Sequence, residues 1–171
     1  MNKQNRGKDF ESEIRKCLEN LPNVSFDRLP DPMAGYSGIR NICDFSMYNY
    51  PYMFFLECKS LYGNTLNYAS SITQNQWEGL FEKSKIYGCI AGICVWYIDY
   101  DLTVFVKIQD LWEHRKAGNK SLNITDITSE NSVNHFIIDG VKKRVRFNYF
   151  GEPFLKKLHL LAEEQWGEKG A

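Results

Sequence analysis

The sequence lacks the features that would place the chain in a membrane, outside the cell or around a zinc ion. Its longest apolar run, 89–98, has the length of a strand and is too short to span a bilayer. The N-terminal residues are polar and contain no apolar segment typical of a signal peptide. The five cysteines form no Cys-x-x-Cys pair, so we expect reduced, mostly buried thiols. We therefore expect a cytoplasmic protein without a membrane partner.

Net charge is also lacking, because 21 basic and 21 acidic residues cancel. This balance argues against a uniformly basic surface for non-specific nucleic-acid binding but leaves room for a local basic groove. An apolar fraction of 43% and a charged fraction of 25% are typical of a folded globular protein. Because 171 residues without a repeat or a long linker suit one unit, we expect a single domain over residues 1–171.

Hydrophobic periodicity predicts the secondary structure. Helices are expected at 8–20, 74–87, 110–117 and 153–166, with Thr73 as the N-cap of the second and Pro153 in the first turn of the last. Strands are expected at 24–29, 44–48, 53–59, 89–98 and 102–108. The order indicates a mixed sheet flanked by helices, in the α/β class.

The C-terminal third is less regular. Residues 118–134 are polar and aperiodic, which predicts a loop. An Asp139-Gly140 pair between extended runs predicts a hairpin turn, and with the closing helix it forms a C-terminal segment over about residues 134–167.

The stretch from Asp44 to Lys59 holds the best candidates for chemistry. Glu57 and Lys59 point to one face of the predicted strand, and Cys58 points to the other. If the two extended segments pair as neighbouring strands, Asp44 meets Glu57 at one end of the sheet. Two carboxylates beside a lysine suit a divalent metal and the water that it activates. An isolated Glu-x-Lys is explained more simply by a surface ion pair, so this pattern alone does not establish a site.

A third acidic residue remains undecided on pattern alone. Glu11 and Glu13 lie at opposite edges of the apolar stripe of the helix at 8–20, and periodicity favours neither of them.

Several basic residues are open to two interpretations. Arg28 and Arg40 flank an irregular segment, and each taken singly fits a surface charge better than a phosphate contact. Lys142, Arg144 and Arg146 alternate with apolar residues and are expected to form one basic face of the second hairpin arm. That face suits a solvated edge strand and a strip facing phosphates about equally.

Taken in order, the motifs resemble the restriction-endonuclease-like nucleases, whose signature is an Asp, a gap and then Glu-x-Lys on a sheet hairpin. Within that group the chain resembles the RecU family of Holliday-junction resolvases. The matching pieces are Gly7 to Ile14, Asp44, Glu57-Cys58-Lys59, Asn64-Thr65, Gln76 with Leu80, Gly92 to Val95, and 104–112. The likeness covers a core of roughly residues 7–112. The segment at 31–41 is much shorter than the basic stalk of that family, as in compact phage versions.

The resemblance implies a Mg²⁺-dependent endodeoxyribonuclease that resolves Holliday junctions in DNA recombination and repair, with Mn²⁺ as a substitute. It implies metal ligation by Asp44, Glu57 and the backbone carbonyl of Cys58, and it selects Glu11 as a further ligand, directly or through a water. Lys59 would orient the attacking water or stabilise charge on the phosphate. Gln76 would help to position either group.

The resemblance also implies partners. The residues expected to contact DNA are Arg28, Arg40, Thr65, Lys142, Arg144 and Arg146. Nicking two strands of a four-way junction symmetrically needs two sites, which implies a homodimer. Two alternatives remain: a nuclease of the same fold that acts on other branched or damaged DNA, and a non-catalytic DNA-binding accessory protein of recombination.

Overall fold

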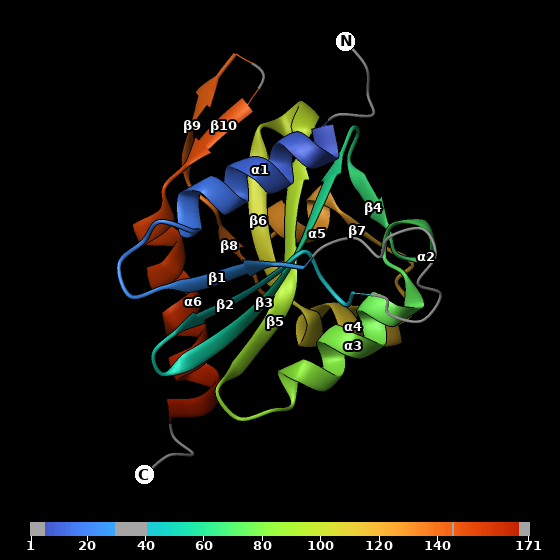
Figure 1. Cartoon of the computed structure of the whole chain (residues 1–171). Helices are drawn as coiled ribbons and strands as arrows, with labels where there is room; N and C mark the ends of the chain where they lie inside the picture. The colour runs from blue at the N-terminus through green and yellow to red at the C-terminus, as the bar shows by residue number, and fades with distance from the viewer. Residues whose placement is uncertain (1–5, 30–40, 145, 168–171) are drawn as a thin grey trace, which may run out of the picture.

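The computed structural model describes residues 6–29, 41–144 and 146–167, and within them six strands form one mixed sheet. The strand order across this sheet is β1-β2-β3-β5-β6-β8 (Figure 1). The strands are β1 (Ser25–Arg28), β2 (Phe45–Asn49), β3 (Tyr52–Leu61), β5 (Cys89–Tyr97), β6 (Leu102–Lys107) and β8 (Phe136–Ile137). Strands β3 and β5 run parallel, and the other neighbouring pairs of this sheet run antiparallel.

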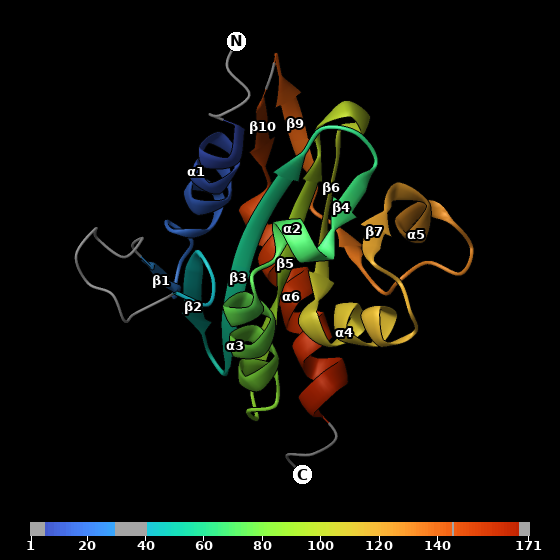
Figure 2. The ribbon, with the colours of Figure 1, turned by 90° about the vertical axis from the view of Figure 1, so that its right-hand side faces the viewer.

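Helices cover both faces of the sheet (Figures 1 and 2). One face is covered by α1 (Arg6–Leu18) and α6 (Gly151–Trp166), and the other by α3 (Gln74–Ser84) and α4 (Ile108–Lys116). Because both faces are covered, every residue of β5 is buried, as its apolar sequence predicts. The α/β class with a mixed central sheet is therefore confirmed. Along the chain, α1 is followed by an antiparallel β1–β2–β3 meander, a crossover that includes α3, and the parallel strand β5.

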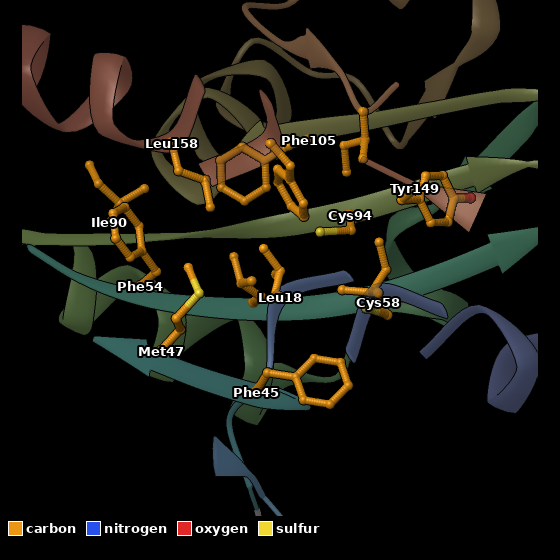
Figure 3. Packing of buried hydrophobic residues seen from close by; sticks show 14 of the residues in the cluster. Leu18, Phe45, Met47, Phe54, Cys58, Ile90, Cys94, Phe105, Tyr149 and Leu158 are labelled. Carbon is orange, nitrogen blue, oxygen red and sulfur yellow. The ribbon is translucent and has the colours of Figure 1, made fainter. Parts of the chain in front are cut away.

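Two hydrophobic cores lie on either side of the sheet. On the α1 and α6 side, Leu18 and Leu158 share one cluster with strand residues such as Met47, Phe54 and Ile90 (Figure 3). On the α3 and α4 side, the cluster is built around other helix and strand residues: Trp77, Leu80, Ile93, Val106 and Leu111. All five cysteines are free and four of them are buried, as expected. Among the described residues, no helix combines the length and the hydropathy needed to cross a bilayer.

The prediction of a structureless loop over 118–134 is wrong. This segment contains β7 (Ser121–Asn123) and α5 (Ile124–Thr128), and β7 pairs with β4 (Thr65–Asn67), which leads into α2 (Tyr68–Ser71). Figure 2 shows β7 and α5 to one side of the main sheet. The Asn123 side chain caps α5 in a capping box with Asp126. Elements this short have too few residues to produce a periodic pattern.

The predicted position of the C-terminal hairpin turn is also wrong. The hairpin consists of β9 (Gly140–Lys143) and β10 (Arg146–Tyr149), and its turn includes Arg144, whose φ is 53°. Gly140 instead pairs with Tyr149 inside the ladder, where a Cβ atom would lie 2.7 Å from the Asn148 carbonyl oxygen. The glycine therefore serves close strand packing, and the charged residues of the segment are divided between two strands.

Candidate active site

The candidate site lies where β3 extends beyond its neighbour β2. Phe45, the first residue of β2, pairs with Leu56, and within the described residues no strand pairs with β3 on that side from Glu57 onward. The Asp44 carboxylate occupies this edge, because its Oδ2 accepts a hydrogen bond of 2.8 Å from the Cys58 backbone N–H. The N–H and C=O of one strand residue point to the same side, so the Cys58 carbonyl faces the same open edge.

Strand register brings the two predicted carboxylates together. Continuing the β2–β3 pairing by one residue places Asp44 directly opposite Glu57, on the same face of the sheet. The Cys58 side chain lies on the other face, within the core shown in Figure 3. Burial raises the pKa of the Cys58 thiol, which keeps it a neutral core residue.

Glu57 is buried, with 3% of its surface exposed, and its two carboxylate oxygens differ. Its Oε1 accepts a hydrogen bond from Gln76 Nε2 at 2.6 Å and forms an ion pair with Lys59 Nζ at 2.7 Å. Its Oε2 is buried and has no hydrogen-bond partner in the protein. Leaving a buried carboxylate oxygen unpaired costs free energy, so this atom is a strong candidate for binding a cation or a ligand.

Electrostatics at Glu57 favour a cation. Burial and the neighbouring Asp44 carboxylate raise the pKa of Glu57 from 4.5 to about 7, and Glu11 adds a smaller contribution in the same direction. Lys59 opposes this rise through its charge and its hydrogen bond. A positive ion beside these carboxylates would offset their repulsion and favour the ionised form of Glu57.

Gln76 connects the site to the start of α3. Thr73 caps this helix, as predicted, and accepts a hydrogen bond from the Gln76 backbone N–H at 3.2 Å. In return Gln76 Oε1 accepts from the Thr73 N–H at 3.1 Å, which completes a capping box. The same Oε1 accepts from Lys59 Nζ at 3.3 Å, so the amide nitrogen is directed to Glu57. The cap therefore fixes the orientation of the side chain in the site.

Lys59 lies at the solvent side of this group, with 21% of its side chain exposed. An ammonium group has three N–H donors. Two of them are directed to Glu57 and Gln76, which leaves one for a further acceptor. Lys59 is thereby oriented by the protein and still able to contact an anion.

Of the two helix glutamates, Glu11 lies on the flank of α1 near the carboxylate pair. It contributes to the raised pKa of Glu57, and its Oε2 lies 3.8 Å from the Arg28 guanidinium. Glu13 instead forms an ion pair of 2.9 Å with Lys16.

Two of the residues expected to contact DNA form ion pairs within the protein. Lys142 forms an ion pair with Asp101, and Arg146 forms one of 3.1 Å with Asp9. Arg144 lies exposed at the hairpin turn, so the expected single basic face of one strand is not present.

Of the other residues expected to contact DNA, Thr65 joins two short strands and Arg28 lies near the carboxylate pair. The Thr65 hydroxyl donates to Asn64 Oδ1 at 2.9 Å and accepts from Asn123 Nδ2 at 2.8 Å, which joins β4 to β7. Arg28 ends β1 beside Glu11. Arg40 lies outside the described residues.

The donor set fits a hard divalent cation. In the described part of the chain, no group of three or more His, Cys, Asp or Glu side chains is placed to hold a metal ion. The candidate set is of another kind, since it combines the carboxylates of Asp44 and Glu57 with the Cys58 carbonyl. Oxygen donors of this number suit Mg²⁺, which keeps several waters and also binds substrate phosphates.

Two basic residues near the site were not predicted from the sequence. Lys8 and Arg15 line a hollow that also contains Glu11, Arg28 and Phe45. The signal was present in the sequence: residues 8, 11 and 15 follow the i, i+3, i+7 spacing of one helix face.

Comparisons with known proteins leave the family open. No family model matches the chain, and no curated protein matches it. The chain is similar to a solved structure of Archaeoglobus fulgidus Hjc, a Holliday junction resolvase from an archaeal hyperthermophile. That similarity covers 60% of this chain and 74% of the other, with 18% sequence identity and a TM-score of 0.40. A similarity this distant does not carry an activity from one protein to the other.

Proposed function

We propose that this protein is a metal-dependent endonuclease that hydrolyses phosphodiester bonds in branched DNA, with the four-way Holliday junction as its substrate. The observation that carries the proposal is the Asp44–Glu57 carboxylate pair at an open sheet edge, in which Glu57 Oε2 is buried and unpartnered. Lys59 and Gln76 contact the same carboxylate. The order of these residues along the chain resembles that in the RecU resolvases.

The proposed cofactor is Mg²⁺, with Mn²⁺ as a substitute. Asp44, Glu57 and the Cys58 carbonyl would hold the ion, and Glu11 would contribute directly or through a water. When bound, such an ion offsets negative charge on a phosphate and lowers the pKa of a coordinated water.

The chain's own residues have separate roles in this proposal. Asp44 closes the end of β2 and presents one oxygen to the site while its Oδ2 holds the Cys58 N–H. The remaining Lys59 donor orients the attacking water or stabilises negative charge growing on the phosphate. Gln76 fixes the positions of the Lys59 and Glu57 side chains, because its amide oxygen accepts a hydrogen bond from Lys59 and its amide nitrogen donates one to Glu57.

The decisive experiment measures cleavage of a synthetic four-way junction by wild-type protein, Asp44→Asn and Lys59→Ala, with and without Mg²⁺. Asp44→Asn retains an acceptor for the Cys58 N–H, so its fold should persist. We expect Mg²⁺-dependent cleavage by the wild type and a loss of roughly 100-fold or more in each variant. Lys116→Ala, a change of an exposed lysine on α4, is the matched control. Equal cleavage by all four proteins would refute the site.

The substrate and the assembly are tested separately. The short 31–41 segment leaves flaps and other branched duplexes as alternative substrates, and cleavage rates on these against the junction distinguish the two. Symmetric cutting needs two sites, so we infer a homodimer. Light scattering coupled to size-exclusion chromatography measures its mass directly.

A further inference from the structure

A basic hollow adjoins the proposed active site, and we propose that it binds a phosphate of the DNA backbone next to the one that is cut. This inference rests on the proposed function and assigns new substrate-binding roles to Lys8 and Arg15. The hollow is lined by Lys8, Glu11, Ser12, Arg15, Arg28 and Phe45 and has a volume of about 220 Å³.

The elements that form the hollow explain its position. Lys8, Glu11 and Arg15 project from successive turns of α1 at i, i+3 and i+7 and so lie on one flank of the helix. Arg28 ends β1, and Phe45 follows Asp44 directly in the chain. Glu11 lines the hollow and also contributes to the raised pKa of Glu57, so it forms a wall shared with the carboxylate site.

The charge of the hollow is positive in a chain whose net charge is zero. Three cations and one carboxylate line it. The existing ion pairs are long: Arg28 to Glu11 measures 3.8 Å, and Arg15 Nε to Glu19 measures 3.4 Å. The arginine side chains are 48% and 43% exposed, and Arg15 Nε makes no hydrogen bond. Exposed pairs of this kind stabilise a protein little, so both guanidinium groups can turn to an incoming anion.

The chemistry of the lining selects a phosphate group. Guanidinium groups bind phosphate oxygens through paired N–H donors, and a lysine adds a mobile positive charge. The Ser12 hydroxyl supplies a neutral donor, and the volume holds a phosphate together with several waters.

A second basic hollow lies on the other flank of α1, between this helix and β10. It is lined by Lys16, Lys143 and Arg146 among others, and Arg146 is already paired with Asp9 at 3.1 Å. Because Glu13 rather than Glu11 lines that hollow, it does not share a wall with the carboxylate site. The hollow beside Glu11 is therefore the one assigned to the substrate strand.

The test measures DNA binding in EDTA, so that it does not depend on cleavage. The proteins are the wild type, Lys8→Gln, Arg15→Gln and the control Lys116→Gln, which removes the same charge on α4. The probe is a synthetic four-way junction titrated across a range of salt concentrations. We expect each hollow variant to lower the slope of log affinity against log salt by about one and to weaken binding roughly threefold to tenfold. Lys116→Gln should match the wild type.

A second measurement identifies the contacted phosphate. Junctions carrying a single neutral methylphosphonate are scanned along the strand on both sides of the scissile position. One flanking methylphosphonate should weaken wild-type binding and have a smaller effect on Arg15→Gln, because that variant has already lost one of the contacts to this phosphate. Additive losses at every flanking position would overturn the inference.

The outcomes separate the two proposals. If Lys8→Gln and Arg15→Gln show the same salt slope as the wild type, and the wild type cleaves the junction, the phosphate assignment is wrong and the proposed nuclease function is unaffected. A wild-type protein that binds no DNA overturns both. Unfolding curves of the four proteins serve as the folding control.

Discussion

The Glu57 carboxylate is held by one oxygen and unsatisfied at the other. Two donors fix Oε1, whereas Oε2 is buried without a partner. Burial favours the protonated form of such a carboxyl group, and its ionisation lowers the stability of the folded protein. Two consequences can be measured without any substrate.

The first consequence is a pH dependence of stability in metal-free protein. The pKa of Glu57 is about 7 in the folded chain and 4.5 in the unfolded one, so the folded state binds more protons between these values. The free energy of unfolding therefore falls as pH rises from 4.5 to 7, by on the order of 2 kcal/mol. Glu57→Gln cannot ionise and should lack this fall. Urea unfolding in EDTA at several pH values measures it, and parallel curves for the two proteins would contradict the assignment.

The second consequence is stabilisation by Mg²⁺ at pH 7.5. An ion that binds only the folded protein raises the free energy of unfolding by about 2.7 kcal/mol at 100 times its dissociation constant. Thermal unfolding should show a higher midpoint with Mg²⁺ in the wild type and a much smaller rise in Asp44→Asn. Asp101→Asn, which changes an exposed carboxylate paired with Lys142, is the control and should respond like the wild type. The same midpoint rise in all three proteins would remove Asp44 from the ligand set.

At the scale of elements, the start of α3 links helix stability to the site. The Thr73 hydroxyl and the Gln76 amide cap the helix reciprocally, and the same amide bonds to Glu57 and Lys59. The cap residues are thus positioning residues for the proposed chemistry.

Thr73→Ala should cost about 1 kcal/mol of stability, because the Gln76 N–H loses its acceptor. The first turn of α3, which carries Gln76, is then less firmly fixed, so cleavage should fall even at temperatures where the variant is fully folded. Thr73→Ser keeps the hydroxyl and should restore both properties. Denaturant unfolding and cleavage rates measure the two effects, and a Thr73→Ala protein with normal stability would show that the cap is dispensable.

The long periodic elements and the short strand β1 were predictable, whereas the short elements β4, α2, β7 and α5 were not. The capped start of α3 and the buried β5 follow from residue type and apolar content. The Asp139-Gly140 pair led to a wrong prediction of the hairpin turn. Gly140 is required for close packing against β10, and local sequence does not reveal this contact. The β4–β7 pairing joins segments that are far apart in the chain, so no local sequence pattern predicts it.

At the scale of the whole molecule, α6 completes the core on one face of the sheet. Leu158 is fully buried there, whereas Leu160 on the same helix is 49% exposed. These two leucines form a matched pair for testing how much of the stability depends on this face.

Leu158→Ala should lower the free energy of unfolding by about 2–5 kcal/mol, because it leaves a cavity in the core. Leu160→Ala should change it by less than about 0.5 kcal/mol. Chemical denaturation of both variants checks the difference, and equal losses would show that α6 is not packed on the sheet as described.

Only the part of the candidate site that lies on a single strand was predictable from the sequence. Alternation places Glu57 and Lys59 on one face, but the meeting of Asp44 with Glu57 depends on a register that only the folded sheet sets. The position of Glu11 depends on how α1 crosses the sheet, and a helical wheel contains no such information. Lys8 and Arg15 follow a helical spacing that was visible, yet only the contact with β1 turns them into one hollow.

Asp44 stands both at the end of a strand and in the proposed catalytic group, so two selective pressures converge on one position. Within the described residues no strand pairs with Cys58 on this side, and the Asp44 carboxylate accepts the hydrogen bond of its backbone N–H instead. In a library of all substitutions at residue 44, asparagine should preserve protein abundance while abolishing activity, and most other residues should reduce both. A natural variant with asparagine there would be a folded, abundant protein that still occupies DNA, and in a dimer it would act as a dominant inhibitor of its active partner.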